Sequence, residues 1–207
     1  MLRMPAQMTR SERRNQMSAR EPRTSHGFTL IELMIVVAIV GVLSMLALYT
    51  VRTYAVATKT TEARNSLGQI GKDAATTYEK ETMTAAVLQT GHSALFSRNL
   101  CKSASLSVPH SKTSIRGAKY QSLASEWSVD VGDSGFACLK FVMDQPQYYM
   151  YSYQSTGGGS SGTAFTATAN GDLNGDGILS TFSLTGSVTP NFTLAVAPNL
   201  LEISGSE

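Results

Sequence analysis

An uninterrupted apolar run dominates the early part of the chain. Residues 28–51 contain a single formal charge, the carboxylate of Glu32. As a helix rising about 1.5 Å per residue, this segment would span about 36 Å, which exceeds the ~30 Å hydrocarbon core of a bilayer. The pattern therefore predicts a membrane-spanning helix over residues 28–52. A carboxylate near the centre of such a helix costs about 2.5 kcal/mol or more, so Glu32 requires a partner.

Beyond the apolar run, helical spacing continues but becomes amphipathic over residues 53–82. Apolar positions recur every three or four residues along one stripe, apart from one wider gap. They are Ala57, Leu67, Ile70, Ala74 and Tyr78. Charged residues occupy the other faces, which predicts a helix that packs one side on a sheet and ends near residues 80–84. Gly68 and Gly71 weaken this helical pattern.

The rest of the chain changes from irregular to strand-like. Residues 83–126 show no sustained period, which indicates a connector with a short helix around residues 94–97. In residues 127–207 the expected strands are 136–143, 148–153, 163–169 and 180–184, with 193–196 as a further edge strand. Turn sequences at 144–147 and 157–162 predict an antiparallel meander. The expected fold class is α+β, a long N-terminal helix packed on a small antiparallel β-sheet head over residues 127–207.

Residues 1–27 form a basic leader ahead of the apolar run. The leader carries six arginines and two glutamates, whereas cations are sparse just after the run. This asymmetry predicts a cytoplasmic N-terminus and a body across the membrane. An ordinary secretory signal has an apolar core of roughly 7–15 residues followed by a small-residue cleavage site. Here the core is longer and the small residue, Gly27, precedes it, so a cut at Gly27 would leave the helix on the mature chain.

Cleavage after Gly27 would also supply the partner that Glu32 lacks, because it exposes an α-amine on Phe28, four residues earlier. Residues 27–41, GFTLIELMIVVAIVG, resemble the cleavage and methylation motif of type IV pilins and pseudopilins. The resemblance implies a pilin fold. It also implies that prepilin peptidase cuts between Gly27 and Phe28 and methylates Phe28. Glu32 would then pair with the N-terminal amine of a neighbouring pilin subunit in a helical filament.

The same resemblance implies a location. The precursor would span the inner membrane once, in contact with its lipid, with the head in the periplasm. After cleavage it would join a cell-surface or periplasmic filament of a bacterium. The expected partners are therefore prepilin peptidase and other pilin subunits.

The chain departs from the family pattern in two places. Thr24, Ser25 and His26 precede Gly27 where a basic residue is usual, and Tyr49 stands where major pilins often carry proline. The missing proline favours a minor pilin over a major one. The alternatives are a pseudopilin of a type II secretion or DNA-uptake machine, a filament-tip adhesin with a calcium-dependent loop, and an anchor that is never cleaved.

Charge and cysteine content narrow these expectations. The chain has a net charge of +2 and the leader accounts for +4, so the remaining side chains sum to −2 and offer no basic patch for nucleic acid.

Cys101 and Cys138 are expected to form one disulfide in a periplasmic or surface domain. The bridge would tie the connector to the strand predicted at 136–143. Closing a loop of about 38 residues would contribute roughly 4 kcal/mol. Two free buried thiols are the alternative.

One loop begins like a calcium-binding loop, with the pattern D-x-N-x-D-G from Asp172. The candidate ligands are Asp172, Asn174, Asp176, the backbone carbonyl of Ile178, and Ser180. The twelfth position holds Ser183 instead of the usual bidentate glutamate. Asn-Gly and Asp-Gly are also strong hairpin signals, so a β-turn without metal is the alternative.

No arrangement in the sequence supports catalysis. Residues 91–95 share part of a nucleophile-elbow pattern but lack its last glycine, and the three histidines lack metal-ligand spacing. We therefore expect a structural protein and no enzyme.

An aromatic cluster could form either an adhesive patch or part of the core. Because most of its members alternate along a predicted strand, the core is favoured. Its members are Trp127, Tyr148, Tyr149, Tyr151 and Tyr153.

Overall fold

A computed structural model describes residues 27–80, 82–83, 96–130 and 132–204. The chain divides into two compact units, Met1–Ala47 and Leu48–Glu207, which are described separately. The predicted leader therefore lies outside the described residues, except for Gly27. Residues 94–95 of the predicted short helix also lie outside them.

One long helix, α1 (Leu30–Glu79), runs through both units. It is long and apolar enough to cross a membrane, and none of its 18 most apolar consecutive residues is buried within the chain. The helix ends one residue before the predicted range of 80–84, where the Lys80 N–H donates to the Thr77 carbonyl.

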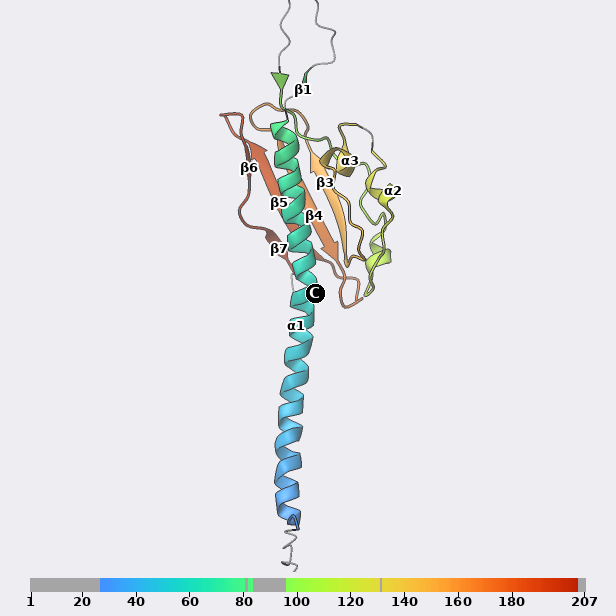
Figure 1. Cartoon of the computed structure of the whole chain (residues 1–207), viewed down its shortest axis with the longest axis vertical. Coiled ribbons are helices and arrows are strands. Elements are labelled where there is room, and N and C mark those ends of the chain that lie inside the picture. The colour runs from blue at the N-terminus through green and yellow to red at the C-terminus, as the bar shows by residue number, and fades with distance from the viewer. Residues whose placement is uncertain (1–26, 81, 84–95, 131, 205–207) are drawn as a thin grey trace, which may run out of the picture. The chain divides into compact units, whose positions relative to one another are not determined.

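Within the second unit, α1 buries one stripe against the sheet (Figure 1). The buried residues are Thr60, Ala63, Leu67, Ile70, Gly71, Ala74 and Tyr78. The prediction that Ala57 belongs to this stripe is wrong, because its side chain is exposed. Val56, four residues before Thr60, packs against the core in its place. The wider gap in the predicted stripe is filled by Thr60 and Ala63, whose small side chains permit close packing.

The sheet is antiparallel, with β3 (Tyr149–Ser155), β4 (Ala164–Gly171), β5 (Ser180–Val188) and β6 (Leu194–Val196) in that order. A fifth strand, β7 (Leu201–Ile203), pairs with the first part of β5. Side chains alternate between buried and less buried positions along β3, β4 and β5. The strands predicted around 148–153, 163–169, 180–184 and 193–196 are confirmed, whereas β7 was not predicted. The α+β fold class is also confirmed (Figure 1).

The strand predicted at 136–143 is wrong. Gly135–Leu139 forms a short helix, α3, and Lys140 ends it with a left-handed backbone (φ 60). Phe136 and Leu139 lie three residues apart and are both buried on one side of this helix. Trp127 packs edge-on against Phe136, with ring centroids 5.0 Å apart. A short apolar run fits a buried strand or a buried helix equally well, and only this packing decides between them.

The connector covers the outer edge of β3. The N–H groups of Ala104 and Val108 donate to the Tyr153 and Tyr151 carbonyls. This segment contains η2 (Lys112–Ile115), and α2 (Ala124–Trp127) follows it. Two further short strands, β1 (Thr82–Met83) and β2 (Phe96–Ser97), pair with each other. The part of the predicted helix at 94–97 that the structure describes is therefore strand.

The predicted disulfide joins Cys101 to Cys138. It ties the connector to α3, where the sequence had predicted a strand. The bridge closes a sequence separation of 37 residues, so it restricts the unfolded chain considerably.

Candidate functional site

The first candidate site is the start of α1. Gly27, Phe28 and Thr29 precede the helix, and the Phe28 side chain is 85% exposed. A Cβ placed on Gly27 would meet nothing within 4 Å. The peptide bond between Gly27 and Phe28 therefore lies in open, non-helical backbone. A protease can take such a segment into its active site without first unwinding a helix.

Thr29 and Glu32 cap the helix together. The Thr29 hydroxyl accepts a hydrogen bond from the Glu32 N–H at 3.3 Å, and it faces the Glu32 carboxylate with Oγ1 and Oε2 3.5 Å apart. The Thr29 carbonyl accepts from the Leu33 N–H. These contacts resemble a capping box, which satisfies N–H groups that a helix start leaves unpaired. Our sequence analysis missed this role, although the spacing Thr-x-x-Glu is the signal that reveals it.

Glu32 combines this local role with an unbalanced charge. A carboxylate in the first turn interacts favourably with the positive end of the helix dipole. Within residues 27–51 it is the only charged side chain, and no ion pair joins it to another described residue. The site therefore positions a carboxylate four residues after Phe28, and the described residues 27–51 provide no cation to pair with it.

The helix surface around this site is apolar on every side. Each large apolar side chain between Phe28 and Val51 is more than half exposed. The Ser44 hydroxyl donates to the Val40 carbonyl at 2.7 Å, so this polar group is satisfied within the helix. A proline at position 49 would break the helix, but Tyr49 stands there and the helix continues without interruption. Such a surface requires lipid or other apolar helices around it.

The second candidate site is the loop that begins at Asp172. The Asp172 side chain is 2% exposed, and its two oxygens accept from the N–H groups of Gly175 (2.7 Å) and Gly177 (3.0 Å). The Arg116 Nε lies 3.9 Å from the same carboxylate and donates to the Gly175 carbonyl at 2.9 Å. Asp172 therefore holds the loop closed and fixes it against the connector.

The other predicted calcium ligands also make contacts within the loop or its flanking strands. The Asp176 carboxylate accepts from the Ile178 N–H and from the Asn174 amide, whose oxygen accepts from the Asp176 N–H. The Ser180 hydroxyl donates to the Gly171 carbonyl. Among the described residues, no group of three or more His, Cys, Asp or Glu side chains is placed to hold a metal ion. The contacts are those of a turn stabilised by its own side chains.

The aromatic cluster is core packing. Tyr149, Tyr151 and Tyr153 are fully buried, and Trp127 is 2% exposed. Tyr148 is half-buried, and the ammonium groups of Lys59 and Lys119 lie over its ring at 4.9 and 4.7 Å. The preferred prediction of core packing is therefore confirmed. An adhesive patch made of all five residues is excluded, because four of them are buried.

Sequence reasoning missed a half-buried carboxylate between helix and sheet. The Glu62 Oε1 atom accepts from the Tyr148 N–H at 2.9 Å and from the Tyr151 hydroxyl at 3.3 Å. Burial raises the pKa of Glu62, and these hydrogen bonds oppose the increase. Burial also raises the pKa of Tyr149 to about 12. No local signal marks Glu62, because its partners lie far away in the sequence.

Comparison with known proteins bears on the N-terminal site. The prokaryotic N-terminal methylation motif matches residues 22–48, a segment that includes Gly27, Phe28, Thr29 and Glu32. Comparisons of the chain with curated proteins and with solved structures gave no match. The motif and the apolar helix indicate a membrane-anchored precursor, and the second unit has the α+β architecture expected behind such a helix. The chain thus carries, at the start of its long apolar helix, the methylation motif that supports a type IV pilin-like prepilin.

Proposed function

We propose that this chain is a structural subunit of a type IV pilus or a related filament, and that it is no enzyme. The observation that carries the proposal is the methylation motif at the start of a helix with exposed apolar side chains on all sides. In the precursor, lipid of the inner membrane covers this surface. In the filament, the equivalent helices of other subunits cover it.

Processing is the first step of this function. Prepilin peptidase cuts between Gly27 and Phe28 and methylates the new N-terminal amine of Phe28. The exposed, non-helical backbone at these residues supports the assignment. Mass spectrometry of the mature N-terminus tests it. Methyl-Phe28 is the expected result, and a mature chain that still carries residues 1–27 would contradict it.

Assembly is the second step. The amine on Phe28 of one subunit pairs with Glu32 of a neighbouring subunit, so that neither charge is left alone among apolar helices. Thr29 supports this step by holding Glu32 at the helix start. The precursor has its N-terminus in the cytoplasm and its head in the periplasm, and the assembled filament lies in the periplasm or at the cell surface of a bacterium.

We propose a minor pilin as the more specific role. An unbroken helix through Tyr49 supports it, because major pilins often carry a helix-breaking proline there. The discriminating measurement is abundance in sheared surface filaments. A minor pilin forms a small fraction of that material. Dominance in it would indicate a major pilin, whereas absence from it would indicate a pseudopilin of a secretion or DNA-uptake machine.

A further inference from the structure

The loop that begins at Asp172 contains a pair of residues that can react with each other. Asn174 is exposed and is followed by Gly175. In an Asn-Gly pair, the glycine nitrogen can attack the side-chain carbonyl carbon of the asparagine, because glycine has no Cβ to hinder the approach. The product is a five-membered succinimide ring, which water opens to aspartate or isoaspartate.

This deamidation needs water as its only co-reactant. The Gly175 nitrogen loses its proton to water and forms a bond to the Asn174 Cγ atom. The bond from Cγ to the amide nitrogen breaks, and this nitrogen takes up a proton and leaves as ammonia. Hydrolysis of the ring then consumes one water molecule. The net change replaces the amide of Asn174 with a carboxylate.

Asp172 opposes the attack by the Gly175 nitrogen. Its Oδ1 atom accepts from the Gly175 N–H at 2.7 Å, and its side chain is 2% exposed. The nitrogen must therefore give up a hydrogen bond to a buried carboxylate before it can attack. The same negative charge opposes loss of the proton, because the nitrogen would become anionic. The Gly177 N–H donates to the other oxygen of Asp172 at 3.0 Å, which fixes the carboxylate in place.

Asp176 holds the group that would be attacked. The Asn174 amide nitrogen donates to the Asp176 Oδ2 atom at 2.9 Å, and the Asn174 amide oxygen accepts from the Asp176 N–H at 3.0 Å. Both ends of the amide are thus bound to the residue two positions later. These contacts restrict the rotation of the Asn174 side chain that ring closure requires.

The sequence contains a second Asn-Gly pair, Asn170–Gly171, which is held in a different way. It lies in β4, where Asn170 is paired with Met150 of β3 and with Thr181 of β5. The Thr181 hydroxyl also donates to the Asn170 amide oxygen at 2.8 Å. Ring closure would require this backbone to leave the strand geometry, which both ladders oppose. The sheet therefore protects Asn170, whereas two carboxylates protect Asn174.

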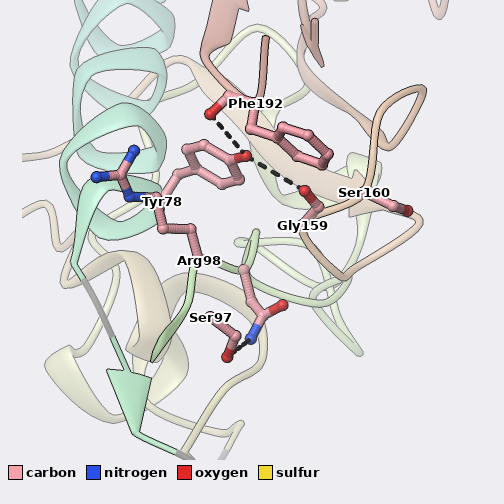
Figure 2. A pocket seen from close by; sticks show the side chains of 7 residues that line it. Tyr78, Ser97, Arg98, Gly159, Ser160 and Phe192 are labelled. Atoms are coloured by element: carbon pink, nitrogen blue, oxygen red, sulfur yellow. Dashed lines mark hydrogen bonds between the residues drawn. The ribbon is translucent and has the colours of Figure 1, made fainter. Parts of the chain in front are cut away.

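An exposed asparagine in another turn provides an unreactive comparison. Asn191 precedes Phe192 in the β5–β6 turn, and the side chain of Phe192 hinders attack by its own nitrogen. The Phe192 N–H donates to the Thr189 carbonyl at 2.9 Å. The Phe192 carbonyl accepts from the Tyr78 hydroxyl at 3.2 Å (Figure 2). Asn191 therefore reports the reactivity of an exposed asparagine that no glycine follows.

We propose that Asn174 is a self-deamidation site, and that Asp172 and Asp176 protect it from cyclisation in the folded chain. Release of either carboxylate allows Asn174 to convert to aspartate and isoaspartate. The conversion places a third negative charge in the loop and removes the amide that donates to Asp176. The calcium-like pattern D-x-N-x-D thus serves the chemical durability of the loop. All the reacting atoms belong to one loop, so the proposal is independent of cleavage and filament assembly.

Peptide mapping by mass spectrometry on the full chain in detergent tests the proposal, with the rate of deamidation at each asparagine as the readout. In the parent, Asn174 should react about tenfold more slowly in the folded chain than in denaturant, where no carboxylate is held in place. Asn191 should react slowly in both states. Equal rates at Asn174 in the folded and the denatured parent would overturn the proposal.

Asp172→Ala and Asp176→Ala remove the two protecting carboxylates separately. Each should raise the rate at Asn174 about tenfold, through the loss of hydrogen bonds to a charged group. The rate at Asn170 should stay at the parental value, because β4 remains paired. Asp144→Ala is the matched control, since it removes an exposed carboxylate outside the loop. Parental rates at Asn174 in both loop variants would overturn the proposal, as would equal rises at Asn170 and Asn174 in both.

Discussion

The Glu62 carboxylate on α1 accepts a hydrogen bond from the Tyr148 N–H at 2.9 Å, which fastens the helix to the start of β3. The Tyr151 hydroxyl donates to the same oxygen. One side chain thus sets the position of the helix against the sheet. Because the carboxylate is half-buried, the strength of this junction depends on its protonation.

Glu62→Gln should change how stability depends on pH. Burial raises the pKa of Glu62 in the folded state above the ordinary value of 4.5. The folded chain therefore binds this proton more tightly. The stability that this proton contributes is fully present below the ordinary pKa of 4.5. It is lost as pH rises through the raised pKa of the folded state. Glutamine cannot ionise, so its advantage in melting temperature over the parent should grow as pH rises above 4.5 and through the raised pKa of Glu62.

The control for this prediction is Glu62→Ala. It leaves the Tyr148 N–H without its partner and should cost about 1–3 kcal/mol at low pH. This cost should become smaller as pH rises, because alanine, like glutamine, does not ionise. A melting-temperature difference between the glutamine variant and the parent that stays constant with pH would contradict the assignment.

Gly71→Ala and Gly68→Ala should have opposite effects on stability. A Cβ on Gly71 would lie 2.7 Å from a methyl carbon of Leu184, whereas a Cβ on Gly68 would meet nothing within 4 Å. Alanine at Gly68 should stabilise the helix by up to about 1 kcal/mol. Alanine at Gly71 should cost about 1–3 kcal/mol through overpacking. The same gain in helix propensity, up to about 1 kcal/mol, offsets part of this cost. Chemical denaturation measures both, and equal stabilisation would show that Leu184 moves aside freely.

Replacing both Cys101 and Cys138 with serine should lower the free energy of unfolding by about 2–5 kcal/mol. The bridge restricts a long loop of the unfolded chain and also fixes the connector to α3. Denaturation of the oxidised parent and of the serine variant tests this effect. Equal midpoints would mean that the bridge adds nothing to stability.

Calcium should leave the melting temperature of the chain unchanged at millimolar concentration. The carboxylate oxygens of Asp172 and Asp176 already accept hydrogen bonds from donors within the loop. Asp172→Ala should cost about 1–3 kcal/mol because it removes the carboxylate that accepts from the N–H groups of Gly175 and Gly177. The exposed Asp176 should matter less, by about 0.5 kcal/mol. A rise in melting temperature with calcium, lost in Asp176→Ala, would establish the metal site instead.

Glu32→Val should be cleaved and inserted normally but should yield about a tenth or less of the parental filament, because each N-terminal amine would lie unpaired among apolar helices. Thr29→Ala is the matched control, since it removes the capping hydroxyl and keeps the carboxylate. Mass spectrometry of the mature N-terminus and the amount of sheared filament give the two readouts. Parental filament yield from Glu32→Val would refute the assembly role.

The sequence alone determined the features that depend on neighbouring residues. The apolar run, its single carboxylate at Glu32 and the glycine before Phe28 are all local, so they define the helix and the proposed processing site without any tertiary contact. The alternation in β3, β4 and β5 is local as well. The capping contact between Thr29 and Glu32 could also have been predicted from the four-residue pattern Thr-x-x-Glu, although our sequence analysis did not interpret that pattern as a cap.

The tertiary structure decided what depends on distant partners. Phe136 and Leu139 lie in a helix because Trp127 and the core pack against one side of it, which the run of apolar letters does not specify. Glu62 accepts hydrogen bonds from Tyr148 and Tyr151, which lie far from it in the sequence. Local periodicity records which side of an element is apolar. It does not indicate which distant residues will pack against that side, because these contacts depend on the packing of the whole second unit.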